Sequence, residues 1–169
     1  IAVMSLGGVV FSKSLRIAGD AMDGAIINYM RKKFNLLIGE STAEKIKKEI
    51  GTAIPTTNNI FLMKGRDIRT GTPKEISLTE EDACEALMPI LSQMLAAIKE
   101  ALESTPPELS ADLVDMGLVL TGGGALLKNI DKLISKDTGL PVTIADNPLE
   151  CVAIGTGKAL ENEELFSTM

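Results

Sequence analysis

The segment "LVLTGGGALLKNIDKL" (Leu118–Leu133) joins an apolar run to three consecutive glycines and then to a helical pattern. A strand that enters a helix in this way exposes backbone N–H groups at the positive end of the helix dipole. Because glycine has no Cβ, a flat or charged ligand can approach the backbone closely. A tight turn is the plainer reading, but a turn needs fewer glycines. We therefore interpret Gly122, Gly123 and Gly124 as a ligand contact, for a phosphate or equally for a ribose or purine face.

Two common nucleotide-binding fingerprints do not fit the chain. The G-x-G-x-x-G frame fails at the triglycine and no acidic residue follows at the expected strand end, which disfavours a dehydrogenase. The "GTGKAL" segment (155–160) resembles the end of a P-loop, but Val152 and Ala159 stand where that loop requires Gly and Ser or Thr. We interpret its glycines as small residues that let a helix pack closely.

The composition excludes several classes of protein. The 169 residues carry a net charge of −6, which argues against a nucleic-acid binder. The chain has no histidine, so Ser-His and Cys-His catalysis and imidazole metal ligands are excluded. Cys84 and Cys151 fit no zinc spacing, and we expect both to be reduced, buried residues. No apolar run approaches the roughly 20 residues of a membrane span.

Periodicity and turn residues predict alternating strands and helices in the first half of the chain. A β-hairpin is expected around Gly7-Gly8, followed by a helix from Asp20, and a second helix that starts with a Ser41–Glu44 capping box and ends at Gly51. Two further extended runs, Ile60–Met63 and Ile68–Leu78, are expected to join around Gly65.

The second half is predicted to contain helices and two short strands. A long helix capped by Thr79 and Asp82 contains Pro89, and a short helix runs from Pro106-Pro107 through Val114. The remaining predicted elements are a strand at Leu118–Leu120, a helix at Leu126–Ser135, a strand at Pro141–Ala145, a helix at Pro148–Leu160 and a frayed acidic tail.

These elements fall into two regions. Residues 1–35 and 110–169 alternate strands and helices and predict a larger α/β subdomain, whereas residues 36–109 predict a smaller inserted subdomain with helices and a β-hairpin. The chain opens at Ile1 in a strand that is already under way, without an initiator Met. We therefore expect it to be a fragment of a longer protein.

Charged residues on two predicted helices have both a structural and a functional interpretation. Glu44, Lys47 and Lys48 crowd one helix face through i,i+3 and i,i+4 spacing. On the residues alone, a capping Glu44 with solvated lysines is favoured over contacts to a ribose and a base. Asp20 and Asp23 stand at a helix start, where capping alone explains an acid, and nothing else supports a Mg²⁺ site there.

Four longer segments together resemble one protein family. They are "IAVMSLGGVV", "RIAGDAMDGAIINYMRKKFNLLIGESTAEKIKKEIG", "TPPELSADLVDMGLVLTGGGALLKNIDKLI" and "PLECVAIGTGKALE". The chain is similar to the MreB family, the bacterial actin-like proteins that set rod shape, from Ile1 to about Glu161. The "LTGGG" motif alone is shared with the wider superfamily of actins, sugar kinases and heat-shock chaperone ATPases.

The resemblance implies an actin-like (ribonuclease H-like) α/β fold with a mixed sheet, flanking helices and the smaller inserted α+β subdomain. It also implies that this chain is the C-terminal half of a protein that binds ATP and Mg²⁺ in a cleft between its halves. The family's second phosphate loop would lie immediately before Ile1. Such proteins polymerise into filaments on the inner face of the cytoplasmic membrane, with cell-shape and wall-synthesis membrane proteins as partners.

The resemblance also assigns roles to residues of this chain. It implies that the adenosine part of the nucleotide lies against Gly122, Gly123, Gly124 and Ala125. Glu44 and Lys47 would meet the ribose and base, and Gly19 would lie near the phosphates; no catalytic residue or metal ligand is assigned. We expect weak ATP binding and no turnover by this chain alone. The alternatives are an actin-like scaffold without turnover, or half of another ATPase of the superfamily.

Overall fold

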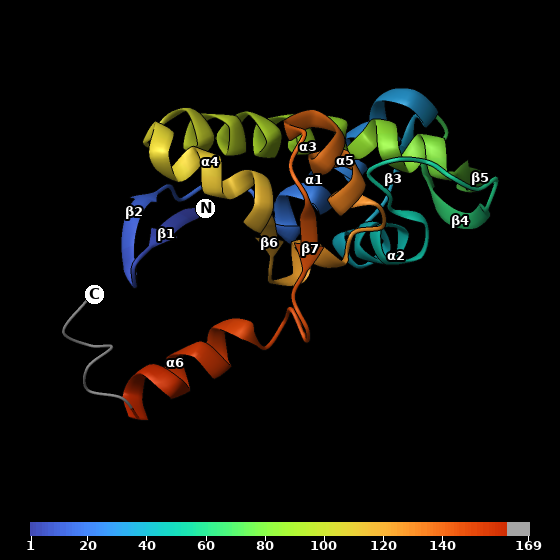
Figure 1. The fold of residues 1–169 in the computed structure, drawn as a ribbon. Helices are drawn as coiled ribbons and strands as arrows, with labels where there is room; N and C mark the ends of the chain where they lie inside the picture. The colour runs from blue at the N-terminus through green and yellow to red at the C-terminus, as the bar shows by residue number, and fades with distance from the viewer. Residues whose placement is uncertain (162–169) are drawn as a thin grey trace. The chain divides into compact units, whose positions relative to one another are not determined.

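The computed structural model describes residues 1–161, so the predicted fraying of the acidic tail lies outside the described residues (Figure 1). The chain divides into two compact units. Unit 1 comprises Ile1–Leu15, Met94–Leu126 and Asp131–Met169, and unit 2 comprises Arg16–Gln93 and Leu127–Ile130.

Unit 2 is built around two helices and a small sheet. Its elements are α1 (Gly19–Phe34), β3 (Leu36–Leu37), α2 (Glu40–Ile50), β4 (Ile60–Asp67), β5 (Pro73–Thr79) and the first part of α3 (Glu80–Glu103). The predicted apolar stripe of α1 is confirmed, because Met22, Ile26 and Met30 are all buried. Asn35 ends the helix in the left-handed conformation, with a backbone N–H that donates to the Met30 carbonyl.

The three-stranded sheet of unit 2 is antiparallel, in the order β3-β4-β5. The prediction that its hairpin turns around Gly65 is wrong, because Gly65 lies inside β4 and pairs with Lys74. A Cβ on Gly65 would stand 2.7 Å from the Leu37 carbonyl oxygen, so this glycine permits the close approach of β3. The chain turns instead after Asp67, whose Oδ1 accepts hydrogen bonds from the Arg69 and Thr70 backbone N–H groups.

The capping predictions for α2 and α3 had opposite outcomes at the helix N-termini. The capping box at Ser41–Glu44 is wrong, because α2 begins at Glu40 after Gly39 and no side chain caps it. Its predicted end at Gly51 is confirmed by bonds from the Gly51 N–H to the carbonyls of α2. The cap of α3 is also confirmed, since Thr79 and Asp82 each accept the other's backbone N–H, at 3.2 and 3.0 Å.

Unit 1 contains two small sheets and several helices. Its elements are β1 (Ala2–Ser5), β2 (Gly8–Ser12), the end of α3, α4 (Pro107–Met116), β6 (Leu118–Leu120), the 3₁₀ helix η1 (Gly123–Leu126), α5 (Ile130–Thr138), β7 (Val142–Ile144) and α6 (Cys151–Glu161). β1 and β2 form the predicted hairpin, which turns through Leu6 and Gly7 at φ values of 51° and 79°. β6 and β7 pair in parallel, with Leu118 opposite Val142.

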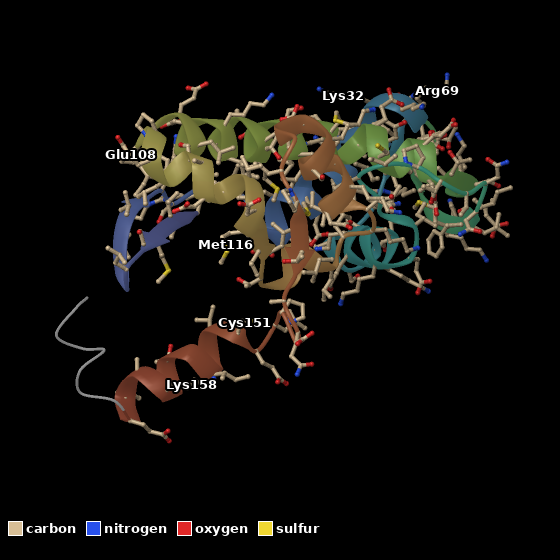
Figure 2. The ribbon with its side chains drawn as sticks, viewed as in Figure 1. Lys32, Arg69, Glu108, Met116, Cys151 and Lys158 are labelled. Carbon is tan, nitrogen blue, oxygen red and sulfur yellow. The ribbon has the colours of Figure 1, made fainter. Side chains whose placement is uncertain are left out.

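Many large apolar side chains of unit 1 are exposed. Met4 and Leu6 lie on the hairpin, Met116 on α4 and Val152 on α6, with exposed fractions from 67% to 106%. Figure 2 labels Met116. Within residues 1–161, no helix combines the length and apolar character that a membrane crossing requires.

The two cysteines lie in different surroundings. Cys84 on α3 is buried in unit 2, its Sγ donates to the Ala53 carbonyl oxygen at 3.4 Å, and burial raises the pKa of its thiol. Cys151, at the start of α6 in unit 1, is only partly buried (Figure 2). Both are free thiols, but only Cys84 fits the expectation of a buried residue.

The compact units do not follow the subdomain boundaries expected from the sequence. Residues 16–35 cluster with the middle of the chain, because α1 packs against α2 and β3. The division into a larger subdomain (1–35 and 110–169) and a smaller one (36–109) remains a prediction about the actin-like architecture.

Candidate functional site

The triglycine forms an open turn after β6 in unit 1. Gly122 has a φ of +78°, and its N–H donates to the Pro148 carbonyl at 2.7 Å. Gly123 and Gly124 are exposed, and a Cβ at Gly122 or Gly124 would meet no atom within 4 Å. Ala125, the fourth predicted contact residue, is buried, with 4% exposure. The backbone here is accessible for close approach.

The helix expected directly after the glycines starts later than predicted. Residues 123–126 form a single 3₁₀ turn, and α5 begins only at Ile130, after Asn129 with a φ of +59°. The predicted helix at Leu126–Ser135 is therefore wrong at its start, although Ile130 and Ile134 face inward as expected. Because no α-helix begins at the glycines, the helix dipole gives no reason to place a phosphate there.

The segment that follows the triglycine turn is fixed within unit 2. The Lys128 carbonyl accepts the Ala53 N–H at 2.8 Å, and Lys128 Nζ donates to the Glu49 carbonyl at 2.6 Å. Thr52 pairs with Lys128 in a parallel bridge. The end of α2 and the residues after it therefore hold this segment.

Lys47 and Gly19, two of the predicted site residues, are brought together in unit 2. Lys47 Nζ donates to the Gly19 carbonyl at 3.2 Å and to Asp23 Oδ2 at 2.9 Å. A Cβ on Gly19 would stand 3.3 Å from Lys47 Nζ, so the missing side chain leaves room for the ammonium. The ammonium thus lies at the N-terminus of α1, tied to α1 by two contacts.

Glu44 has a different partner from the one expected on the residues alone. Its carboxylate pairs with Lys48 Nζ at 2.7 Å, and both side chains are about half exposed or more. The hydrogen bond from Lys48 holds the pKa of Glu44 below its ordinary range. Glu44 is therefore an ionised, accessible acceptor one turn before Lys47 on α2.

Asp23, which the sequence suggests as a capping residue, lies against Lys47 in the structure. It is 9% exposed, and its Oδ1 is buried without a hydrogen-bond partner among the described residues. The signal was its spacing, because Asp23 lies three residues before Ile26 and next to Met22, on the buried stripe of α1. A carboxylate there needs a partner, and Lys47 supplies it.

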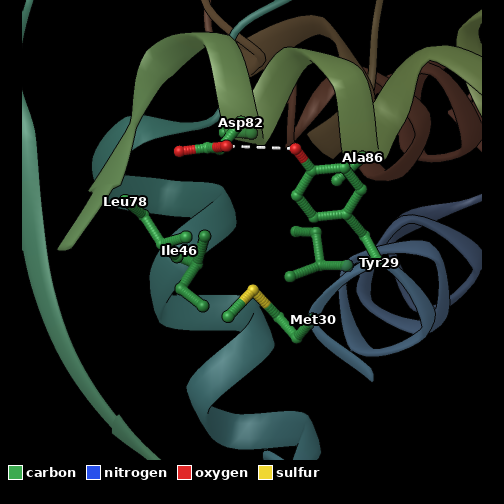
Figure 3. Close-up of a pocket in the computed structure, with 8 residues that line it drawn as sticks. Tyr29, Met30, Ile46, Leu78, Asp82 and Ala86 are labelled. Atoms are coloured by element: carbon green, nitrogen blue, oxygen red, sulfur yellow. Dashed lines mark hydrogen bonds between the residues drawn. The ribbon is translucent and has the colours of Figure 1, made fainter. Parts of the chain in front are cut away.

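A second polar cluster in unit 2 joins α1 to α3. The Tyr29 hydroxyl donates to Glu85 at 2.6 Å and lies 3.1 Å from Asp82, while Lys33 contacts all three groups. Figure 3 shows the Tyr29–Asp82 contact above apolar side chains that include Met30, Ile46 and Leu78. The space between them does not admit a water molecule, so the cluster closes a packed core and forms no ligand pocket.

Acidic residues do not form a metal site in the part of the chain that the structure describes. Nowhere in residues 1–161 do three His, Cys, Asp or Glu side chains gather as metal ligands.

The comparisons with known proteins agree on one family. The family model for MreB/Mbl protein matches residues 1–168. The cell shape-determining protein MreB of Escherichia coli (strain K12) is 50% identical over 162 residues, which cover 95% of this chain and 47% of that protein. The cell shape-determining protein Mbl of Bacillus subtilis (strain 168) is 45% identical over 163 residues, with coverage of 96% and 49%. The chain thus spans about half the length of these relatives.

Solved structures give the same fold. MreB5 of Spiroplasma citri bound to AMPPNP is 38% identical and superposes with a TM-score of 0.90 over 94% of this chain and 48% of that one. The MamK double helical filament, at 19% identity and a TM-score of 0.73 over 88% of this chain and 46% of that one, shows the fold alone. The predicted actin-like α/β fold is confirmed, and the chain belongs to the MreB/Mbl protein family.

Proposed function

We propose that this chain is the nucleotide-binding C-terminal half of an actin-like, cell shape-determining protein that binds ATP. The observation that carries the proposal is its match to MreB5, whose structure is bound to AMPPNP, at 38% identity over 94% of the chain. MreB5 bound to ADP matches equally well.

Each group of residues has a distinct part in the proposed binding. The open turn at Gly122–Gly124, with the backbone of Ala125, allows the flat adenosine part of the nucleotide to approach the main chain. The ionised Glu44 accepts hydrogen bonds from ribose hydroxyls, and Lys47 donates to the ribose or base. Gly19 lies toward the phosphates.

ATP is proposed to bring Mg²⁺ with it. Mg²⁺ commonly keeps several waters and binds through substrate phosphates, which fits a chain whose described residues offer no three-donor site. Tight binding and hydrolysis of a metal-bound triphosphate require groups that grip the phosphates, and the resemblance assigns both phosphate loops to the other parts of the protein. We therefore expect weak binding and no turnover by the 169 residues alone.

An NMR titration of the isotope-labelled chain with ATP tests the proposal. Shifts are expected at Gly19, Glu44, Lys47 and the Gly122–Ala125 turn. Gly124→Leu should abolish the shifts of the turn, because the new side chain enters open space in front of it. Gly155→Leu is the matched control, since a Cβ there also meets no atom within 4 Å. Uniform or absent shifts in the wild type, or ATPase activity above that of Glu44→Ala, contradict the proposal.

We also propose that the whole protein assembles into filaments on the inner face of the cytoplasmic membrane and works there with membrane proteins of cell-shape control and wall synthesis. The exposed apolar side chains of β1, β2 and α6 support self-association. They support equally the alternative of a scaffold without nucleotide turnover. Sedimentation with and without ATP separates the two, because only the scaffold associates to the same extent in both; co-sedimentation with anionic vesicles tests membrane binding.

A further inference from the structure

We propose that Asp23 is a positioning residue, which holds the Lys47 ammonium in place to donate to a ribose hydroxyl oxygen of the bound nucleotide. This inference rests on the proposed nucleotide binding and adds to it a residue that does not touch the ligand. It is carried by the contacts at the N-terminus of α1, all of which lie within unit 2.

The first step is that Asp23 and Lys47 depend on each other. Asp23 is 9% exposed, and a buried carboxylate is unfavourable unless an opposite charge and hydrogen bonds compensate it. Lys47 is the only ion-pair partner that the described residues give it, and Oδ1 has no hydrogen-bond partner there. If Lys47 swung away, the carboxylate would be left without compensation, so the ammonium is held at Oδ2.

The second step is that the ammonium is not fully used by these contacts. A lysine ammonium has three N–H donors, and those of Lys47 have two acceptors in the described residues, Asp23 Oδ2 and the Gly19 carbonyl. The Lys47 side chain is 17% exposed, so a third acceptor can reach it from outside.

The third step concerns Gly19. A Cβ at this position would stand 3.3 Å from Lys47 Nζ, closer than side chains normally pack, so it would displace the end of the lysine by a few tenths of an ångström. The ion pair would keep both its charges. Gly19→Ala therefore changes the position of the ammonium and not its chemistry.

The experiment compares the affinities of the 169-residue chain for ATP and 2′-deoxy-ATP by NMR titration. Asp23→Asn, Lys47→Gln and the double variant are measured, because loss of one charge-assisted hydrogen bond lowers affinity by about tenfold. We expect either single variant to weaken ATP binding by about tenfold and to reduce the preference for ATP over 2′-deoxy-ATP, of which Glu44 retains a part. The double variant should show no further loss.

Gly19→Ala and Gly24→Ala form a matched pair that does not depend on the stability of the charge variants. Gly24 lies in the same helix, and a Cβ there meets no atom within 4 Å. Gly19→Ala should reduce the preference for ATP over 2′-deoxy-ATP, and Gly24→Ala should bind both nucleotides like the wild type.

The outcomes separate the two proposals. If the wild-type chain binds neither nucleotide, the proposed function fails and this inference fails with it. If the wild type binds but the effects of Asp23→Asn and Lys47→Gln multiply, or if Asp23→Asn keeps the wild-type preference for ATP, only the positioning role of Asp23 is overturned.

Discussion

The two units differ in where they keep their apolar side chains. Unit 2 buries Ile26, Met30, Leu36, Ile46, Leu78, Leu87 and Leu91 almost completely, and it exposes Ile60 and Leu62 by 66% and 63%. Unit 1 exposes a larger set by 62% or more, which includes Met4, Leu6, Val114, Met116, Val152 and Leu160. Unit 2 also satisfies the buried carboxylate of Glu80 from within its own residues. A unit that covers its core is expected to resist unfolding, and one that exposes apolar surface is expected to associate.

The largest expected effect on stability comes from a substitution in the core of unit 2. Leu87→Ala removes a side chain with 0% exposure from α3 and should lower the free energy of unfolding by about 2–5 kcal/mol. Leu160→Ala, the same change at a 68% exposed position of α6 in unit 1, should stay within about 0.5 kcal/mol. Urea denaturation measures both, and equal losses would mean that the two units do not differ in this way.

A smaller effect is expected at the glycine inside β4. Gly65→Ala should lower the free energy of unfolding by about 1–3 kcal/mol, because the new Cβ would overlap the Leu37 carbonyl and the Leu36 side chain. Gly24→Ala, at an open position inside α1, should instead raise it by up to about 1 kcal/mol. Thermal unfolding of the two variants gives the signs, and a stabilising Gly65→Ala would contradict the close approach of β3.

The next effect on stability is expected for the buried carboxylate of Glu80, and it should depend on pH. It accepts hydrogen bonds from the Thr57 hydroxyl at 2.7 Å and from the Thr56 and Thr57 backbone N–H groups at 3.1 and 3.0 Å. Glu80→Gln should lower the free energy of unfolding by about 1–2 kcal/mol at neutral pH. The Thr57 hydroxyl, followed by the Thr56 N–H, holds the pKa of Glu80 below its ordinary value of 4.5.

The sign of this pH dependence follows from the lowered pKa. The folded state binds the proton less well than the unfolded state, so the contribution of Glu80 is present above about pH 4.5 and is lost as the pH falls through the folded-state pKa. The difference between wild type and Glu80→Gln should therefore shrink in acid. Glu81→Gln, at the exposed neighbouring position, is the control and should show little difference at any pH.

The smallest effect on stability is expected for Glu44, whose partner Lys48 is mostly exposed. Glu44→Gln should leave the melting temperature close to that of the wild type, because exposed i,i+4 pairs contribute little. The same substitution should lower the affinity for ATP, because Glu44 is proposed to contact the ribose. A large fall in the melting temperature without a change in affinity would assign Glu44 to structure and remove it from the proposed site.

Local patterns predicted those elements whose signals are local. The stripe Met22, Ile26 and Met30 indicated α1, and Thr79 with Asp82 indicated the start of α3. The family resemblance, carried by long segments, led to the correct fold.

The wrong predictions concern positions where several local signals compete, or where residues distant in the sequence determine the local structure. The Ser41–Glu44 spacing suggested a cap, but the chain already becomes helical at Glu40 and Glu44 pairs with Lys48. The conformational freedom of Gly65 suggests a turn, whereas the close approach of β3, which requires this glycine, cannot be seen in the sequence. The Asp23–Lys47 pair joins two helices, so no local pattern could indicate it.

The contrast between Cys84 and Cys151 makes the chain selectively labelable. A thiol reacts as its thiolate, so burial and a raised pKa protect Cys84 in unit 2, while the partly exposed Cys151 on α6 is open to a maleimide or iodoacetamide reagent. A single fluorophore or spin label can therefore be attached to unit 1 of the wild-type sequence, and association could be followed without engineering a cysteine.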